Sequence, residues 1–305
     1  MTDALSFTPR FFAAHDGVRL RAGVFRANPE TRGVCVLLHG QTEFIEKYGE
    51  VIGELNARGY TVATFDWRGQ GGSERPLSDP LKSYVKDFAQ FDDDLLSFLE
   101  QIVGPISDTP PIALAHSMGA HILLRTLHDR PSAFRAAALS APMIAVSARG
   151  YPAWLARFVT AAYYGLGQSG SFAWGMAARD PFLIDFDNQL VTSDRARFQT
   201  TQDFLKTHPD LRLAGPTWGW LEAAYKSMAR VNAPGFAEAI PMPVLVAGPG
   251  KDRICLTPAT KAFTARMPKG EYLDLPDSEH EILMENDSIR QRFWSAFDAF
   301  TAKLG

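Results

Sequence analysis

Continuous apolar runs alternate with helical patterns over the first part of the chain. The apolar runs lie at 34–39, 61–66, 111–115 and 136–140. Such runs are typical of strands buried on both faces of a parallel sheet. Between them, apolar residues recur at helical spacing at 48–58, 88–102 and 118–128. This order predicts an α/β fold in which a mostly parallel sheet is covered by helices on both faces.

The two ends of the series complete the predicted core. Strand patterns at 11–14 and 19–25 are separated by the turn signal H-D-G, which predicts an opening hairpin. The alternation stops near residue 142 and resumes with a strand at 243–248, a helix at 258–267, a strand at 272–275 and a final helix at 287–303. We therefore divide the chain into an α/β core, residues 1–141 and 242–305, and a largely helical cap, or lid, of residues 142–241.

The predicted cap is rich in aromatic residues. It holds four of the six tryptophans, Trp154, Trp174, Trp218 and Trp220. Aromatic rings bury large apolar areas, so we expect most of them to pack the cap onto the core. Trp218 and Trp220 are also candidates for substrate contact. The same composition is compatible with a transient contact between the cap and a membrane surface.

The composition is that of a globular protein with a large core. The chain has 305 residues, of which 46% are hydrophobic and 21% charged, and its formal net charge is −3. Basic residues are scattered, which argues against a nucleic-acid partner. The N-terminus lacks a signal-peptide pattern, and no run approaches the roughly 18 apolar residues of a membrane span. We expect a cytoplasmic enzyme whose oligomeric state the sequence leaves open.

Neither the cysteines nor the acidic triplet predicts a metal site. Cys35 and Cys255 lie far apart without neighbouring ligand residues, so we expect two small buried thiols. Asp92, Asp93 and Asp94 lie opposite the apolar face of the predicted helix at 88–102, and we expect them on a solvated face. No metal or organic cofactor is expected.

The stretch A-H-S-M-G at 115–119 carries a candidate nucleophile, Ser117. It departs at Ala115 from the G-x-S-x-G pattern of a nucleophile elbow, which is a sharp turn between a strand and a helix. An apolar strand precedes Ser117 and an apolar helix follows it, as this turn requires. Residues that flank the serine must be small because the turn is tight, and alanine adds a single methyl group. We therefore predict Ser117 as the nucleophile.

A serine nucleophile needs a base, and the base needs an acid that orients it. In open-sheet hydrolases these follow the serine in the order acid, then histidine. Of the seven histidines, only His280 falls in the C-terminal part of the core. Asp252 comes directly after the first strand that follows the cap, where carboxyl ends of strands build active sites. Asp274 and Asp277 are weaker candidates, and the predicted triad is Ser117, Asp252 and His280.

The oxyanion of such a reaction needs two backbone N–H donors. Met118, directly after the nucleophile, supplies one, and Gln41, after the strand at 34–39, supplies the other. His39 lies in this backbone turn, so we interpret it as structural rather than as the base. The glycine-rich stretch at 69–73 lacks the lysine and spacing of a phosphate loop, and we interpret it as a tight loop.

On these residues the chain resembles the α/β-hydrolase superfamily, in the branch of monoacylglycerol lipases and bacterial lysophospholipases. The matching stretches occur in family order and span nearly the whole core: L-L-H-G-Q-T-E (37–43), F-D-W-R-G-Q-G-G-S (65–73), A-H-S-M-G (115–119), G-K-D-R-I-C (250–255) and E-H-E-I-L (279–283). Inside the cap, P-T-W-G-W-L (216–221) is similar to the lysophospholipase L2-like members. The resemblance implies the same triad and an aromatic cap over an acyl-chain pocket.

We therefore expect a serine esterase that cleaves a monoacyl lipid ester, either a lysophospholipid or a monoacylglycerol, through an acyl-enzyme. One alternative is an esterase, thioesterase or peptidase with the same triad and a short non-lipid substrate. Another is a non-catalytic binding protein on this fold. A dehalogenase is disfavoured because a serine, not an aspartate, occupies the elbow.

Overall fold

The structure is a computed structural model that describes residues 7–29, 32–148, 150–176 and 184–304. The first six residues, on which the expectation of no signal peptide partly rests, lie outside the described part. Among the described residues, none of the helices combines the length and the apolar character that crossing a membrane requires.

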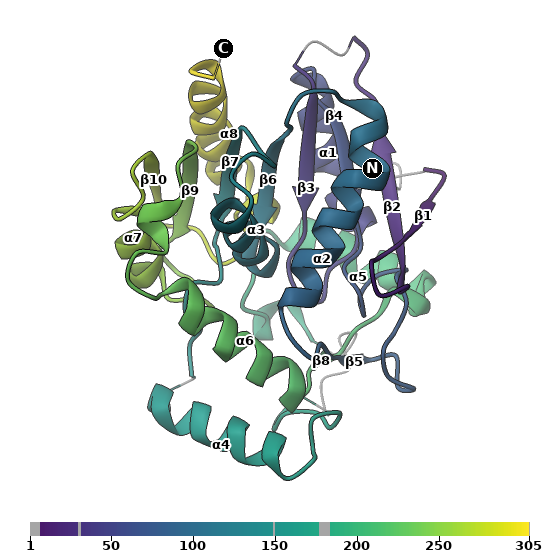
Figure 1. Ribbon diagram of the computed structural model, residues 1–305, viewed down its shortest axis with the longest axis vertical. Coiled ribbons are helices and arrows are strands. Elements are labelled where there is room, and N and C mark those ends of the chain that lie inside the picture. The colour runs from purple at the N-terminus through teal and green to yellow at the C-terminus, as the bar shows by residue number, and fades with distance from the viewer. Residues whose placement is uncertain (1–6, 30–31, 149, 177–183, 305) are drawn as a thin grey trace.

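An eight-stranded sheet runs through the molecule (Figure 1). In spatial order its strands are β1 (Arg10–Ala13), β2 (Arg19–Phe25), β4 (Thr61–Phe65), β3 (Val34–Leu38), β6 (Ile112–His116), β7 (Ala136–Ser140), β9 (Val244–Pro249) and β10 (Gly270–Leu275). The pairings β1–β2 and β2–β4 are antiparallel, and the other pairings in this sheet are parallel. The predicted mostly parallel sheet with an opening hairpin is confirmed.

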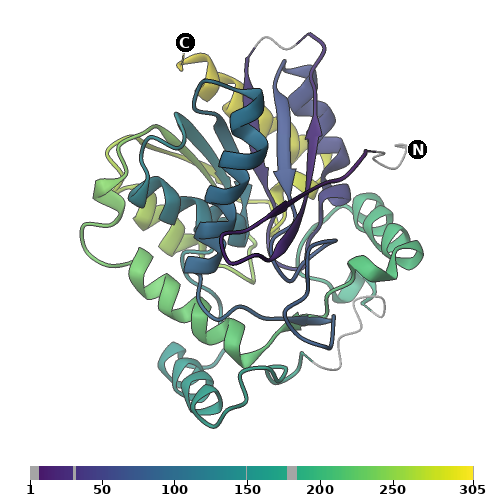
Figure 2. The same ribbon diagram turned by 45° about the vertical axis from the view of Figure 1, so that its right-hand side comes forward.

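Helices cover both faces of this sheet, as Figures 1 and 2 show. One face carries α2 (Ala89–Phe98), α3 (Ser117–Asp129) and α7 (Thr257–Thr264), and the other carries α1 (Gly49–Ala57) and α8 (Asp287–Ala302). Within β3, Val34 and Val36 pack in the core on the face of α2, α3 and α7. Cys35 and Leu37 pack in the core on the face of α1 and α8. Because both faces are covered, the central strands β3, β4, β6, β7 and β9 are buried at every position and mostly apolar.

The segment between β7 and β9 carries α4 (Ala153–Gly165), α5 (Arg195–Thr207) and α6 (Trp218–Val231). α4 packs on α6, and both lie at the lower end of the view in Figure 1. A two-residue pairing of β5 (Lys82–Ser83) with β8 (Gly215–Pro216) ties this segment to the long loop after β4. The sequence patterns did not predict this pair, because two residues carry no periodicity.

Hydrogen bonds fasten α6 to the core along its length. At its start, the Thr217 hydroxyl donates to the Ser83 carbonyl at 2.8 Å. In its middle, the Ser227 hydroxyl lies 2.6 Å from His121 Nε2 of α3. Just beyond its end, the Asn232 side-chain amide donates to the Ile144 carbonyl at 2.8 Å. α6 is therefore held at its start and middle by residues of the first part of the core and at its end by Ile144, shortly after β7.

Shorter helical turns complete the described structure. The 3-10 turns are Ile45–Tyr48, Gly104–Ile106, Phe186–Asn188, Pro209–Leu211, Ala237–Ala239 and Ile282–Met284, and a π-helical turn, Leu99–Val103, continues α2.

The solvated face predicted for the acidic triplet is wrong for two of its three members. Asp94 is fully buried and accepts from Arg68 Nε at 2.7 Å. Asp92 is half-buried and paired with Arg125 of α3. Burial raises the pKa of Asp94 to about 6, against the opposing effect of Arg68. Helical periodicity placed these residues opposite the apolar face, but it could not show that arginines from other elements cover that face.

Candidate active site

Ser117 stands at the sharp turn from β6 into α3. Its φ of 50° lies in the left-handed region, which costs a non-glycine residue on the order of 1–3 kcal/mol. A Cβ at Gly119 would lie 2.8 Å from the Leu38 carbonyl oxygen and closer still to that of His39, so only glycine fits there. Ala115, in contrast, is fully buried in the core beside β3 and β7. The turn therefore accepts a methyl group on its strand side and excludes one on its helix side.

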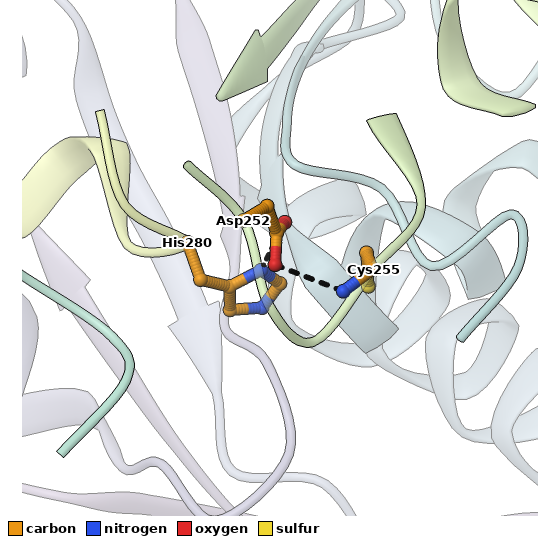
Figure 3. Close-up of side chains that lie close together, drawn as sticks. All are labelled: Asp252, Cys255 and His280. Carbon is orange, nitrogen blue, oxygen red and sulfur yellow. Dashed lines mark hydrogen bonds and ion pairs between the residues drawn. The ribbon is translucent and has the colours of Figure 1, made fainter. Parts of the chain in front are cut away.

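The structure brings the three predicted triad side chains together. His280 Nε2 lies 2.9 Å from Ser117 Oγ, and His280 Nδ1 lies 2.7 Å from Asp252 Oδ2. The pairing of Asp252 with His280 is drawn in Figure 3. Asp274 and Asp277, the weaker acid candidates, are exposed. The alternation of strands and helices carries Ser117 and Asp252 to the carboxyl ends of β6 and β9, where the loop with His280 meets them.

Asp252 is held as a carboxylate. Its Oδ1 accepts from the backbone N–H groups of Ile254 at 2.8 Å and Cys255 at 2.9 Å. Burial would raise the pKa of Asp252, but the hydrogen bond from His280 and these two N–H groups hold it below its usual value. An ionised Asp252 accepts a hydrogen bond from the N–H group at His280 Nδ1, which leaves Nε2 free to accept from the Ser117 hydroxyl.

A second histidine lies beside this chain of hydrogen bonds and stays neutral. The ring of His116 is 4.9 Å from the ring of His280, centroid to centroid. Burial lowers the pKa of His116 to about 3, so at neutral pH it carries no charge. Its Nδ1 lies 3.2 Å from the Ser140 carbonyl oxygen, which fixes the ring against β7. A positive charge on His280 is therefore not opposed by one on His116.

The turn after β3 presents Gln41 toward the nucleophile. Gly40 N–H donates to the carboxylate of Glu43, and Thr42 N–H donates to Gln70 Oε1 at 2.6 Å. The Gln41 N–H between them has no hydrogen-bond partner within the described residues. A Cβ at Gly40 would lie 3.2 Å from the Ser117 Cβ, so this backbone runs directly against the nucleophile. Met118 N–H, in the first turn of α3, likewise has no helical partner.

Several residues that support this turn were missed by the sequence reasoning. The stretch at 69–73 does form a loop, and its Gln70 also accepts a hydrogen bond from the Thr42 backbone N–H. Glu43 is buried and accepts from the Tyr48 hydroxyl at 2.8 Å and from Lys47 Nζ at 2.7 Å. The one available signal was their position close to the predicted oxyanion turn. His39 has the structural role expected of it, with Nδ1 2.8 Å from the Gly40 carbonyl oxygen.

An apolar cavity of about 640 Å³ opens above Ser117. Gln41 and Met118 line it beside the nucleophile. Its apolar walls include Leu155 and Val159 of α4 and Trp220, Leu221, Ala224 and Met228 of α6. Trp218 and Trp220 are both buried and both line the cavity, and Trp218 also stacks on Tyr163 with ring centroids 4.6 Å apart. These tryptophans therefore combine packing of α4 and α6 with a place in the cavity wall.

A second cavity of about 520 Å³ is also lined by Gln41. It shares Gln41, Met176, Leu190, Pro216 and Ile254 with the first. Its uncharged polar lining includes Asn188, Gln189, Thr192, Thr201 and Gln202. The two cavities thus meet beside the nucleophile, one lined mainly by apolar side chains and one with many polar groups.

Asp252, Cys255 and His280 also form a group whose possible ligand atoms lie within 4.8 Å of one another (Figure 3). The free thiol of Cys255 is buried, and burial raises its pKa well above the ordinary value. Both ring nitrogens of His280 are already engaged, by Asp252 and by Ser117. A metal ion would have to replace these contacts, so the donor set fits an oriented imidazole better than a metal centre. The prediction that both cysteines are free and buried is confirmed.

The sequence matches the family described as serine aminopeptidase, S33, over residues 29–287. The chain belongs to this family. Lysophospholipase L2 of Escherichia coli strain K12 is 31% identical over 289 residues, which cover 92% of this chain and 83% of that protein. A monoacylglycerol lipase of Mycolicibacterium smegmatis is 30% identical over 133 residues, 44% of this chain and 46% of that protein. The predicted resemblance to this branch of the hydrolases is confirmed.

Solved structures of other proteins have the same fold as this chain. A monoglyceride lipase from Saccharomyces cerevisiae superposes with a TM-score of 0.77 at 19% identity and covers 99% of both chains. A monoacylglycerol lipase from Paleococcus ferrophilus gives 0.73 at 21% identity, covering 93% of this chain and 98% of the other. The fold is that of an α/β-hydrolase, as predicted. Together with the family, the sequence relatives make the chain a serine ester hydrolase, and the non-catalytic alternative is dropped.

Proposed function

We propose that this chain hydrolyses monoacyl lipid esters, lysophospholipids or monoacylglycerols, through an acyl-enzyme on Ser117. Ser117 Oγ attacks the ester carbonyl while His280 takes its proton, and Asp252 stabilises the imidazolium that results. The N–H groups of Gln41 and Met118 donate to the oxyanion. His280 then protonates the departing alcohol and later activates the water that releases the fatty acid. The observation that carries this proposal is the Ser117–His280–Asp252 chain at the end of a large apolar cavity.

The two cavities suggest how the substrate lies. In this proposal the acyl chain occupies the apolar cavity, and the alcohol part extends past Gln41 toward the cavity with the polar lining. Residues 142–241 serve as the cap, because α4 and α6 supply much of the wall around the acyl chain. No cofactor takes part in these steps.

A short-substrate esterase, thioesterase or peptidase remains the competing proposal, and the family description includes a peptidase. The size and apolar lining of the first cavity favour a long acyl chain, because burying each methylene contributes about 0.8 kcal/mol. A series of p-nitrophenyl esters from two to sixteen carbons, run beside monoolein, lysophosphatidylcholine and an aminoacyl-anilide, separates these functions. Preference for two-carbon acyl groups without turnover of either lipid would sink the lipid proposal.

The nucleophile is tested by Ser117→Ala. We expect this variant to lose labelling by a fluorophosphonate probe and to lose kcat by roughly 10⁴- to 10⁶-fold, because the acyl-enzyme cannot form. Cys255→Ser, which changes a neighbouring side chain outside the triad, is the control that retains labelling. Undiminished lipid turnover by Ser117→Ala would refute the mechanism.

We also propose that this enzyme is cytoplasmic and that it reaches its substrate by transient contact of α4 with a lipid surface. Tyr151, Trp154 and Phe158 are 70%, 69% and 66% exposed, and Trp174 is 65% exposed. Arg157 is the single charged residue of α4. Exposed aromatic residues on a nearly uncharged helix suit the boundary between lipid head groups and acyl chains. The same helix lines the acyl cavity, so this contact would bring lipid close to Ser117.

A further inference from the structure

A buried cation links the two loops on which the proposed chemistry depends. Lys47, in the turn Ile45–Tyr48, places its ammonium 2.7 Å from Glu43 and 2.6 Å from Glu281. The side chain of Lys47 is 8% exposed and that of Glu281 is 12% exposed. Burial opposes the charge on Lys47, but the two carboxylates outweigh it and raise its pKa above the usual value. Lys47 is therefore charged throughout the range in which an esterase works.

Each carboxylate controls one part of the site. Glu43 accepts from the Gly40 N–H, so it holds the turn that presents the Gln41 N–H to the substrate. Glu281 directly follows His280, and its backbone N–H donates to the Val191 carbonyl at 2.7 Å. Lys47 thus joins the oxyanion turn to the histidine loop, although Lys47 and Glu281 are 234 positions apart.

Stability alone does not account for such a group. Removing a cation and carboxylates from water is strongly unfavourable, and well-packed apolar side chains often replace buried ion pairs without loss of stability. What apolar residues cannot do is fix the separation of two loops through short, directed hydrogen bonds. A misplacement of about 1 Å in a catalytic group lowers a rate by roughly 10²-fold.

We propose that Lys47, through Glu43 and Glu281, is a positioning residue that fixes the Gln41 donor and the His280 base at their distances from Ser117. This inference rests on the proposed function of Ser117, His280 and Gln41. Lys47 and Glu281 also line the second cavity, where their charges are engaged with each other rather than with the substrate. We therefore expect loss of Lys47 to weaken stabilisation of the transition state more than binding of the substrate in the ground state.

Glu281→Ala is the decisive variant, because it breaks the link to the His280 loop and leaves the Lys47–Glu43 pair intact. We expect kcat on monoolein to fall about 10- to 100-fold with KM within about 3-fold. The affinity for an alkyl boronic acid, which needs both the oxyanion donors and His280, should fall by the same factor as kcat. Glu281→Gln keeps an acceptor for Lys47 and should stay within about 3-fold of the parent. Lys47→Met should lose at least as much kcat as Glu281→Ala.

The matched control is Arg290→Met. Arg290 is a buried cation of α8 that pairs with Glu50 and Glu54 of α1, away from Ser117. We expect it to lower the Tm and leave kcat unchanged. Parental kcat in Glu281→Ala, or a kcat loss in Arg290→Met as large as in Glu281→Ala, overturns the positioning proposal. Ser117→Ala in the same assay separates the two proposals: if it is inactive while Glu281→Ala is fully active, only the role of Lys47 fails.

Discussion

Ser117 shows how a single residue is made reactive by the backbone around it. Its positive φ raises the hydroxyl above the strand and directs it toward His280. The packing of β6 and α3, which are both buried around the turn, stabilises this strained backbone conformation. Gly119 permits the close approach of α3 to the carbonyl groups of Leu38 and His39. The departure at Ala115 is harmless because that residue points into the core of the sheet.

Gly119→Ala tests this asymmetry. Its Cβ would meet backbone carbonyl oxygens, which cannot move aside as a flexible side chain would. We expect a loss of about 1–3 kcal/mol in the free energy of unfolding, measured in urea, and a fall in kcat through displacement of the Met118 N–H. Ala115→Gly, the control on the strand side, should keep kcat and lose only about 0.5–1 kcal/mol of stability. Equal behaviour of the two variants would contradict this account of the turn.

The sequence was informative wherever a residue's role follows from its immediate neighbours. Ser117, Asp252 and His280 each follow or precede a strand or helix with a clear pattern, and their chain order narrowed the choice. The roles of Lys47, Glu281 and Asp94 depend instead on partners from distant segments. Charged residues are ordinarily solvated. A single sequence does not identify the distant residue with which a buried charged side chain forms an ion pair. The ion pairs therefore had to come from the structure.

Among the elements, α4 departs most from the usual surface helix of a globular protein. Such a helix turns an apolar stripe to the core and polar residues to solvent. In α4, Leu155 and Val159 line the apolar cavity, while Trp154 and Phe158 are mostly exposed. Apolar residues on both faces suit a helix with the protein on one side and lipid on the other.

Replacing Trp154 and Phe158 together by serine tests the lipid contact. Both side chains are mostly exposed, so we expect little change in stability. Partitioning onto phosphatidylcholine vesicles, measured by sedimentation, should fall about 10- to 100-fold, because each aromatic side chain contributes on the order of 1.5 kcal/mol when it is buried. Hydrolysis of soluble p-nitrophenyl butyrate should not change. Phe11→Ser, at an exposed aromatic on β1, is the control; vesicle binding that drops equally there would exclude α4 as the contact.

At the scale of the whole molecule, Asp66 joins three segments at the end of β4. Its carboxylate accepts from Arg21 Nε at 2.6 Å, from Ile45 N–H at 3.0 Å and from Gly72 N–H at 2.8 Å. Asp66 is fully buried, and burial alone would raise its pKa. The contacts with His39, Arg21 and Gly72 outweigh burial, so the pKa lies below the usual value.

This sign predicts how Asp66→Asn behaves with pH. A carboxylate with a lowered folded-state pKa contributes stability above its unfolded pKa, about 3.9, and loses it as the pH falls through the folded value. We expect Asp66→Asn to cost about 3 kcal/mol in urea unfolding at pH 7, because Arg21 is left partly unpaired. The difference from the parent should narrow below about pH 4. A difference between Asp66→Asn and the parent that stays constant with pH would rule out the linkage.

The anchoring of α6 to the core has a consequence for substrate choice. Held at its start, middle and end, this helix forms a fixed wall of the apolar cavity, whereas α4 packs on α6. If the acyl chain lies in this cavity as proposed, we expect the fixed wall to limit the length of the chain. Saturated and cis-unsaturated chains of equal length should then be cleaved with similar efficiency, and chains longer than the cavity should be cleaved more slowly.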